Sequence, residues 1–284
     1  MVERKLCVAG LALTVYAEQN LESRQDYVLI FLLHGRTHSQ EHCRELAQAI
    51  LAQPLQPEDS VQRVIITLDH RNHGTRAVDK LRNASWLDMN GNLANATHAL
   101  DMTGIQTGTA LDIIQLIDFL PAYPLFNQAR CINYGVVGIS LGGHTAWHLL
   151  SREKRIRCAV PIIGGPDPLR LLEDRAAKTQ ALLVKTSSSV AFDGLTDIER
   201  EVIRRWIPLE ELSSSDLAGK HVLTVRGGRD TLVPYEASGL AIATTKFAHL
   251  GNVEHFCDQE AGHEVTPAMI AKVSQWLAIQ SNIM

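Results

Sequence analysis

The sequence lacks an excess of positive charge and lacks long hydrophobic runs. Lys and Arg number 27 against 31 Asp and Glu, which gives a formal net charge of −4 and no net basic charge for nucleic acid or anionic lipid. No stretch approaches the roughly 18 apolar residues that a membrane-spanning helix needs. These absences favour a protein that acts on a small molecule, and they predict neither nucleic acid nor a membrane as a partner.

Targeting signals and paired cysteines are also lacking. Residues 1–20 contain apolar side chains but no long apolar core followed by a small-residue cleavage site, so we do not expect a secretory signal peptide. The five cysteines are odd in number and widely spaced, which is typical of a reducing compartment rather than of a disulfide framework. The cytoplasm is therefore the expected location.

Short apolar runs, most of them ending in glycine or a charged residue, are typical of strands buried on both faces of a parallel sheet. Helical patterns alternate with them, and in one of these Leu111, Ile114 and Ile117 share a face. The alternation predicts a doubly wound, mostly parallel α/β sheet flanked by helices, with an antiparallel hairpin of residues 5–18 at its edge. The runs are residues 27–35, 63–74, 131–140, 157–165 and 221–228.

Two segments interrupt this alternation. Residues 75–107 are polar and rich in Asn and Gly, and residues 166–219 contain the charged amphipathic helix DIEREVIRRW. Its apolar side, from Ile198 to Trp206, needs a surface to pack against. We interpret residues 1–284 as a single domain and residues 166–219 as a helical cap or lid inserted into it.

The most informative motif is GISLGG, Gly138 to Gly143, between an apolar strand and a helical pattern. A serine in this context occupies a sharp strand-to-helix turn, where glycines at the flanking positions avoid collisions with the neighbouring strand and helix. The turn exposes the hydroxyl of Ser140 and directs the amide of Leu141 toward the same space. Ser140 is therefore the candidate nucleophile, and the alternative is a buried turn serine.

A serine hydroxyl needs a base to take its proton and a carboxylate to orient that base. Asp230 lies just past a strand and a Gly-Gly turn in VRGGRDTLVPY, and His263 lies in the loop DQEAGHEVTP before the last helix. Asp258 and His255 are the alternatives, but Asp258 lies within the loop leading to His263, and strand alternation explains His255. Ser140, Asp230 and His263 each follow a predicted strand, where open α/β sheets form their sites.

Over nearly the whole chain these motifs resemble those of the α/β-hydrolase family, most closely the esterase branch with dienelactone hydrolases and prolyl-oligopeptidase-type esterases. That branch often shows His-Gly after strand three and a D-x-R-x-H-G-like turn after strand four, here His34-Gly35 and DHRNHG from Asp69 to Gly74. The resemblance implies a Ser–His–Asp hydrolase of esters, thioesters or amides that needs no cofactor. Arg36 departs from the small or apolar residue that many relatives carry, and it bears on the substrate.

The segment LLHGRTHSQEH places three histidines four residues apart, a spacing that would suit a metal site on a helix. The preceding run YVLIFLL instead makes His34 the end of a strand, and Gly35 interrupts the helical pattern. In a fold of this family Gly35 lets the backbone cross the mouth of the site. The amide of Arg36 would then face that of Leu141, and the two would bind an oxyanion. His34 would be a loop-structuring residue bonded to backbone.

The sequence thus predicts a serine hydrolase that cleaves a carboxylic ester, or a thioester, of a small molecule through an acyl-enzyme. Hydrolysis of a carbon–carbon bond in a diketone on the same triad is an alternative. A metal-dependent hydrolase and a non-catalytic binding protein on a hydrolase fold are alternatives from other classes. Arg36 further suggests that an acidic group on the substrate is favoured, and the sequence does not predict the oligomeric state. The candidate pocket residues are His34, Trp86, Met102 and Trp206, and the candidate metal ligands are His34, Asp69, His70 and His73.

Overall fold

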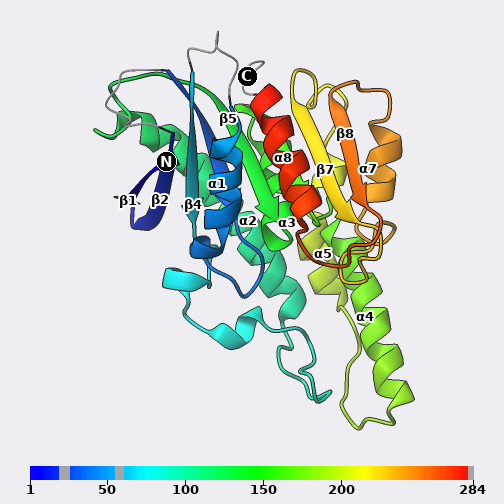
Figure 1. The fold of residues 1–284 in the computed structure, drawn as a ribbon. Helices are drawn as coiled ribbons and strands as arrows, with labels where there is room; N and C mark the ends of the chain where they lie inside the picture. The colour runs from blue at the N-terminus through cyan, green and yellow to red at the C-terminus, as the bar shows by residue number, and fades with distance from the viewer. Residues whose placement is uncertain (19–25, 55–60, 281–284) are drawn as a thin grey trace.

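An eight-stranded sheet forms the centre of the computed structural model, which describes residues 1–18, 26–54 and 61–280 (Figure 1). The strand order is β1-β2-β4-β3-β5-β6-β7-β8; strands β3 to β8 run parallel, and β2 pairs antiparallel with both β1 and β4. The predicted α/β sheet and its edge hairpin are therefore confirmed. The strands are β1 (Val2–Val8), β2 (Leu11–Ala17), β3 (Tyr27–Leu33), β4 (Gln62–Leu68), β5 (Cys131–Ile139), β6 (Ile156–Ile162), β7 (His221–Gly227) and β8 (Val253–Asp258).

Helices cover both faces of the sheet. Helices α1 and α8 lie on one face, and α2 and α3 lie on the other (Figure 1). The α-helices are α1 (Arg44–Ala52), α2 (His98–Phe119), α3 (Leu141–Arg152), α4 (Pro168–Lys185), α5 (Asp197–Arg204), α6 (Pro208–Glu211), α7 (Leu240–Lys246) and α8 (Pro267–Gln280). Short 3-10 turns are η2 (Gln40–Cys43), η3 (Gly74–Arg76), η4 (Lys80–Asn83) and η5 (Leu120–Ala122).

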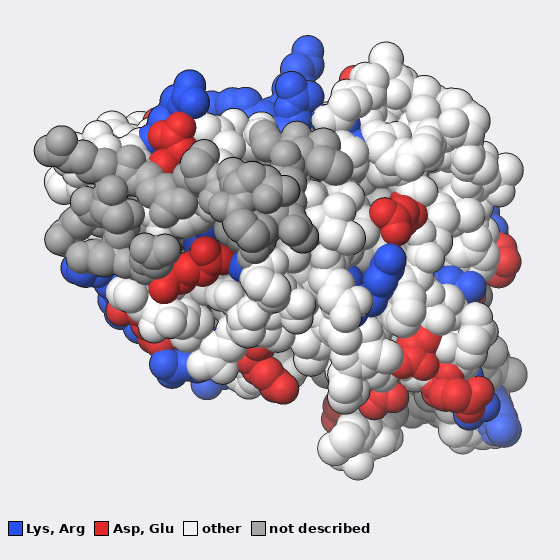
Figure 2. Space-filling view, turned by 45° about the horizontal axis from the view of Figure 1, so that its top comes forward, with Lys and Arg blue, Asp and Glu red and all other residues white. Residues whose placement is uncertain are grey.

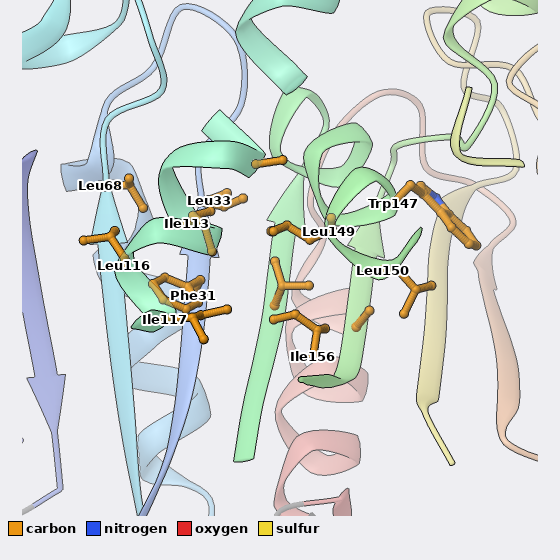
Figure 3. Close-up of a cluster of buried hydrophobic side chains, with 14 of the residues drawn as sticks. Phe31, Leu33, Leu68, Ile113, Leu116, Ile117, Trp147, Leu149, Leu150 and Ile156 are labelled. Atoms are coloured by element: carbon orange, nitrogen blue, oxygen red, sulfur yellow. The ribbon is translucent and has the colours of Figure 1, made fainter. Parts of the chain in front are cut away.

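The central strands are buried along their whole length, which explains why they consist of continuous apolar runs rather than alternating ones. Successive side chains of β3 point to opposite faces. Ile30 and Leu32 pack with α1 and α8, whereas Phe31 and Leu33 pack with α2 and α3. Figure 3 shows Phe31 and Leu33 among the side chains of α2 and α3. The core is therefore two apolar layers separated by the sheet.

Helix α2 is buried around more of its circumference than the sequence pattern predicts. Ile113, Leu116 and Ile117 are 0–1% exposed, but Leu111, expected on the same face as Ile117, is 46% exposed. The predicted face was wrong at Leu111. The reason is that α2 packs against both α3 and α5, so its buried surface is wider than one stripe and is displaced from the predicted one.

Three helices, α4 to α6, lie between β6 and β7 in the chain. Helix α5 begins with a capping box in which Thr196 and Glu199 bond each other's backbone amides. Its Ile203 is fully buried, but Ile198 is 75% exposed and Val202 36% exposed, so the expected burial of the whole apolar side was wrong. The helix packs against α2 and α4 through a narrower strip. Helix α4 extends past the carboxyl ends of β7 and β8 (Figure 1).

Charged side chains of both signs are interspersed on the face that Figure 2 shows. Among the residues described by the structure, no helix has the length and apolar character needed to span a bilayer.

Candidate active site

Ser140 occupies a strained turn between β5 and α3. Its backbone has φ of +53° and ψ of −105°, a conformation that non-glycine residues rarely adopt. The glycines around it are required sterically. A Cβ atom on Gly138 would lie 2.0 Å from the carbonyl oxygen of Gly142, and one on Gly142 would lie 2.6 Å from that of Leu33. The Ser140 amide donates to the carbonyl of Ile162 at 2.8 Å, which fixes the turn against β6.

The structure brings His263 and Asp230 to Ser140 from the loops after β8 and β7. The Ser140 Oγ and the Nε2 of His263 are 2.8 Å apart, and the Nδ1 of His263 is 2.8 Å from the Oδ2 of Asp230. Since the carboxylate can only accept, the Nδ1–H donates to it and Nε2 is left to accept the serine proton. The geometry is therefore that of a nucleophile, a base and a group that orients the base.

Asp230 is held as an ionised carboxylate. Its side chain is 3% exposed, and burial, the largest single influence on its pKa, favours the protonated form. The hydrogen bond from His263 and the amides of Val233 and Leu232, which donate to Oδ1 at 2.8 and 2.9 Å, together outweigh burial. They lower the pKa of Asp230 below its ordinary value. The carboxylate can therefore stabilise an imidazolium at neutral pH.

The loops that carry Asp230 and His263 are bonded to each other. The Gly228 amide donates to the carbonyl of Asp258 at 2.7 Å, and the Arg229 amide donates to that of Ala261 at 2.9 Å. The close approach needs glycine, because a Cβ atom on Gly227 would lie 2.2 Å from the carbonyl oxygen of Gly262. The Gly-Gly turn thus sets the distance between the two loops.

The alternative carboxylate and base have other partners. Asp258 accepts a hydrogen bond from the Thr266 hydroxyl at 2.7 Å, at the start of α8. His255 lies in β8, where its Nδ1 bonds the Thr224 hydroxyl at 2.7 Å on the neighbouring strand. Both side chains therefore have structural partners of their own, whereas Ser140 bonds His263.

The backbone after β3 crosses the end of β5. The Gly142 amide donates to the carbonyl of His34 at 3.2 Å, which links the two turns. In the part of the chain that the structure describes, no hydrogen bond occupies the amide of Arg36 or that of Leu141. The turn continues through Thr37, whose φ is +66°. Two amide donors are thus available beside the serine.

His34 and His70 form a buried, neutral pair. The His34 Nδ1–H donates to the carbonyl of Gly35 at 2.7 Å, and its Nε2 accepts the amide of His70 at 3.1 Å. The His70 ring bonds the carbonyl of His34 at 3.0 Å and the Thr109 hydroxyl at 3.1 Å. Burial lowers the pKa of His34 to about 4 and that of His70 well below its ordinary value. Both rings therefore connect β3 to β4, as expected for a loop-structuring His34.

The structure argues against the metal site considered at His34, Asp69, His70 and His73. One Asp69 oxygen accepts the amide of Gln40 at 2.8 Å, and the other accepts the amide and hydroxyl of Thr75 at 2.7 and 2.8 Å. Within the described residues no three His, Cys, Asp or Glu side chains are arranged to hold a metal ion. Asp69 instead closes the turn after β4, and the side chains around it serve the loops.

Two cavities adjoin at Arg36 and Leu232, next to Ser140. The first has a volume of about 310 Å³ and holds Ser140 and His263; the second, of about 300 Å³, shares Arg36 and Leu232 with it. The remaining residues of the first cavity are Gly35, Thr37, His38, Ile139, Ile163, Glu264 and Val265.

Of the candidate pocket residues, Trp86 lines the second of these two cavities. Met102 is 4% exposed and packs with Ile105 under Leu141, while His34 is buried in the loop network. The placement of Trp206 in the pocket was wrong. Its ring stacks under the guanidinium of Arg152 at 4.3 Å, at the far end of α3 from Ser140, because α5 and α6 pack along the outside of the helical layer.

The sequence reasoning missed Leu232 and Arg175. Leu232 follows Asp230 by two residues, so a search of the loop around the carboxylate would have found it. Arg175 lies on α4 and lines the second cavity with Lys178. Nothing in the amphipathic pattern of α4 indicates which of its charged residues faces a cavity.

The chain has the α/β-hydrolase fold. No family model and no curated protein sequence matches it, whereas many solved structures do. A crystal structure of TT1662 from Thermus thermophilus has a TM-score of 0.65 at 18% identity, with 98% of this chain and 97% of that chain covered. Est1E from Butyrivibrio proteoclasticus, with ferulic acid bound, has a TM-score of 0.60 at 14% identity over 99% and 100%. An acylaminoacyl peptidase from Pyrococcus horikoshii has a TM-score of 0.61 at 14% identity, and the match covers 98% of this chain and 40% of the peptidase.

Proposed function

We propose that the protein is a serine hydrolase that cleaves a carboxylic ester, or a thioester, of a small molecule. The observation that carries this proposal is the hydrogen-bonded series Ser140–His263–Asp230, with the serine on a strained turn at the mouth of a cavity. Neighbours in fold that are named as esterases agree with it. A non-catalytic binding protein would not need these three side chains to be aligned.

In the proposed reaction, the Ser140 Oγ forms a bond to the acyl carbon while His263 takes the hydroxyl proton at Nε2. The amides of Arg36 and Leu141 hold the oxyanion, and each such donor is worth about 3–4 kcal/mol of transition-state stabilisation. Collapse of the intermediate breaks the bond to the leaving group, which receives the proton from His263. Water then attacks the acyl-enzyme and gives its proton to His263. Collapse of the second intermediate breaks the bond between the acyl carbon and the Ser140 Oγ, which takes the proton back from His263 as the acid leaves. Asp230 keeps the imidazole in the required tautomer throughout.

We also propose that the insertion between β6 and β7 shapes the substrate pocket of a single domain. Helix α4 supplies Arg175, Lys178, Thr179 and Leu182 to the second cavity, which Arg36 also lines. A cytoplasmic location remains our prediction, and the free state of all five cysteines agrees with it.

Labelling with a fluorophosphonate, followed by identification of the modified residue, tests the function. We expect the label on Ser140 and turnover of p-nitrophenyl esters or acyl thioesters, both abolished by Ser140→Ala. Full turnover by Ser140→Ala would refute the proposal. The matched control is Ser151→Ala, because Ser151 lies on α3 as well but bonds Glu211 and the carbonyl of His148.

A further inference from the structure

The second cavity places two arginines from different parts of the chain beside the candidate active site. Arg36 follows β3, Arg175 lies on α4, and both line the cavity of about 300 Å³ that adjoins the one holding Ser140. Arg36 and Leu232 belong to both cavities. A group bound in the second cavity is therefore continuous with a substrate at the serine.

Neither guanidinium uses all its donors. The Nη1 of Arg36 donates to the carbonyl of Asn83 at 3.3 Å and to the Ser85 hydroxyl at 3.2 Å. The Nε and Nη2 of Arg175 donate to the carbonyl of Leu232 at 3.2 and 2.8 Å. An arginine has five N–H donors, so both retain donors beyond these bonds. These contacts fix the position of each guanidinium without neutralising its charge.

The carboxylates near the cavity are bound elsewhere. Asp88 lines the cavity, but its Oδ1 accepts the backbone amides of Asn90 and Asn92 at 2.8 and 2.9 Å, and its Oδ2 accepts the Asn92 side-chain amide at 3.3 Å. Asp174 pairs with Lys178 at 2.6 Å. Across the described residues no ion pair includes Arg36 or Arg175. Neither guanidinium therefore has a carboxylate in direct contact, although the more distant charges of Asp230 and Asp174 favour the charged form of Arg175.

This arrangement differs from that of other arginines near the same end of the sheet. Arg71 and Arg76 both pair with Asp112 at 2.7 Å. In contrast, burial and then the charge of Arg36 lower the pKa of Arg175 to about 10. Like charges held close together destabilise the fold unless a ligand compensates them. An anion bound between the two guanidinium groups would do so.

The remaining walls suit an organic anion. Trp86 and His98 line the cavity and meet edge to face, with ring centroids 5.0 Å apart. Burial, with the charges of Arg36 and Arg175, lowers the pKa of His98 to about 3, so its ring is neutral and adds an aromatic surface. The cavity thus places the two guanidinium groups beside an aromatic wall, with Lys178, which pairs with Asp174, as a third cation.

We propose that Arg36 and Arg175 form a subsite for a carboxylate group of the substrate, with Trp86 beside the chain or ring that links this group to the scissile bond. The planar fork of a guanidinium matches carboxylate geometry, which favours arginine over lysine for this role. The inference rests on the proposed hydrolase function and names its substrate class as esters or thioesters of acidic compounds.

The test compares esters that differ in one charge. In the acyl arm, the p-nitrophenyl hemiester of glutarate is compared with p-nitrophenyl valerate. In the leaving-group arm, p-carboxyphenyl acetate is compared with p-methylphenyl acetate. The measured quantity is the ratio of kcat/KM for the anionic ester to kcat/KM for the neutral ester. The two esters differ in intrinsic reactivity, but this difference is the same for every variant and cancels when the ratio of a variant is compared with that of wild type. We expect Arg175→Gln to lower this ratio about 10- to 100-fold in one arm, the range for a charge-assisted hydrogen bond.

The arm that responds shows on which side of the scissile bond the carboxylate lies. Arg36→Gln should lower the same ratio, and Arg175→Lys should retain part of the preference. Arg204→Gln is the matched control, because Arg204 is exposed on α5 and outside both cavities, and it should keep the wild-type ratio. An unchanged ratio in both arms for a folded Arg175→Gln overturns the subsite.

If Arg175→Gln does not fold, the wild-type protein still gives an answer. Glutarate should inhibit turnover of p-nitrophenyl valerate more strongly than the uncharged glutaramide does, and equal inhibition overturns the subsite. If the wild-type protein hydrolyses p-nitrophenyl valerate but shows no preference for the anionic ester in either arm, the subsite is refuted and the proposed hydrolase function stands. Failure to hydrolyse any ester, together with an unlabelled Ser140, refutes the proposed function itself.

Discussion

The carbonyl oxygen of His34 accepts a hydrogen bond from the amide of Gly142 at 3.2 Å. The same oxygen accepts a hydrogen bond from the Nε2 of His70 at 3.0 Å, so three loops meet at one atom. These loops follow β3, β4 and β5, which are neighbours in the sheet. The position of the amides of Arg36 and Leu141 relative to the serine is therefore set by strand pairing, and the histidines of the HGR and DHRNHG segments have a structural role.

Asp230→Asn tests the orienting carboxylate. The variant keeps a similar shape and can still accept the amides of Leu232 and Val233, but it removes the charge opposite His263. Loss of the correct tautomer should lower kcat about 10³- to 10⁴-fold. Asp258→Asn is the matched control, because Asp258 bonds Thr266 at the start of α8, and its kcat should stay within about threefold of wild type. A similar loss in both variants would contradict the assignment.

Gly138→Ala tests the steric demand of the serine turn. The added methyl group would meet the carbonyl oxygen of Gly142 at 2.0 Å, which forces a backbone shift and displaces Ser140. We expect a loss of roughly 2–3 kcal/mol in the free energy of unfolding, measured with urea, and a large fall in kcat. Gly104→Ala is the comparison, since Gly104 is exposed in α2 with no atom within 4 Å of an added Cβ. It should gain about 0.5–1 kcal/mol from helix propensity.

Chelation distinguishes the serine hydrolase from the metal-dependent alternative. The oxygens of Asp69 and the ring nitrogens of His34 and His70 already bond backbone or side-chain groups. We therefore expect EDTA dialysis to leave ester turnover and fluorophosphonate labelling unchanged. Loss of turnover that added zinc restores would support the alternative instead.

The sheet and the three aligned side chains could be predicted because their signals are local. Continuous apolar runs mark the strands, and a glycine-flanked serine must lie on a turn of one shape. Parallel strands then bring Asp230 and His263 to the same edge as Ser140 without further information. The apolar run before His34 likewise indicated that this histidine ends a strand, and so argued against a helical metal site around Gly35.

The cavity walls could not be predicted, because they depend on how helices pack. Trp206 has the large aromatic side chain expected of a pocket residue, but it lies in the turn between α5 and α6, where it packs under Arg152. Arg175 has an ordinary place in a charged helix, and only the position of α4 beside Leu232 brings it toward Arg36. Helix periodicity predicts which face of a helix is buried, but it does not show whether the other faces border a cavity or the solvent.

His148→Leu tests the energetic cost of a buried histidine in α3. His148 is 1% exposed, and neither ring nitrogen has a partner within the described residues. An apolar side chain of similar size removes this cost, so we expect a gain of about 1 kcal/mol in the free energy of unfolding at pH 7. The variant should also flatten the pH dependence, which follows from the pKa of the folded state.

Burial lowers the pKa of folded His148 to about 3, against 6.5 for an unperturbed histidine. Between these values the unfolded chain binds a proton that the folded chain does not, so wild-type stability falls as pH falls below about 6.5. His148→Leu lacks this contribution, and its advantage over wild type should therefore grow by about 3 kcal/mol between pH 7 and pH 4. Urea unfolding of both proteins across this range measures the difference. A constant difference across pH would show that His148 has the same pKa in the folded and the unfolded protein, which would contradict its burial without partners.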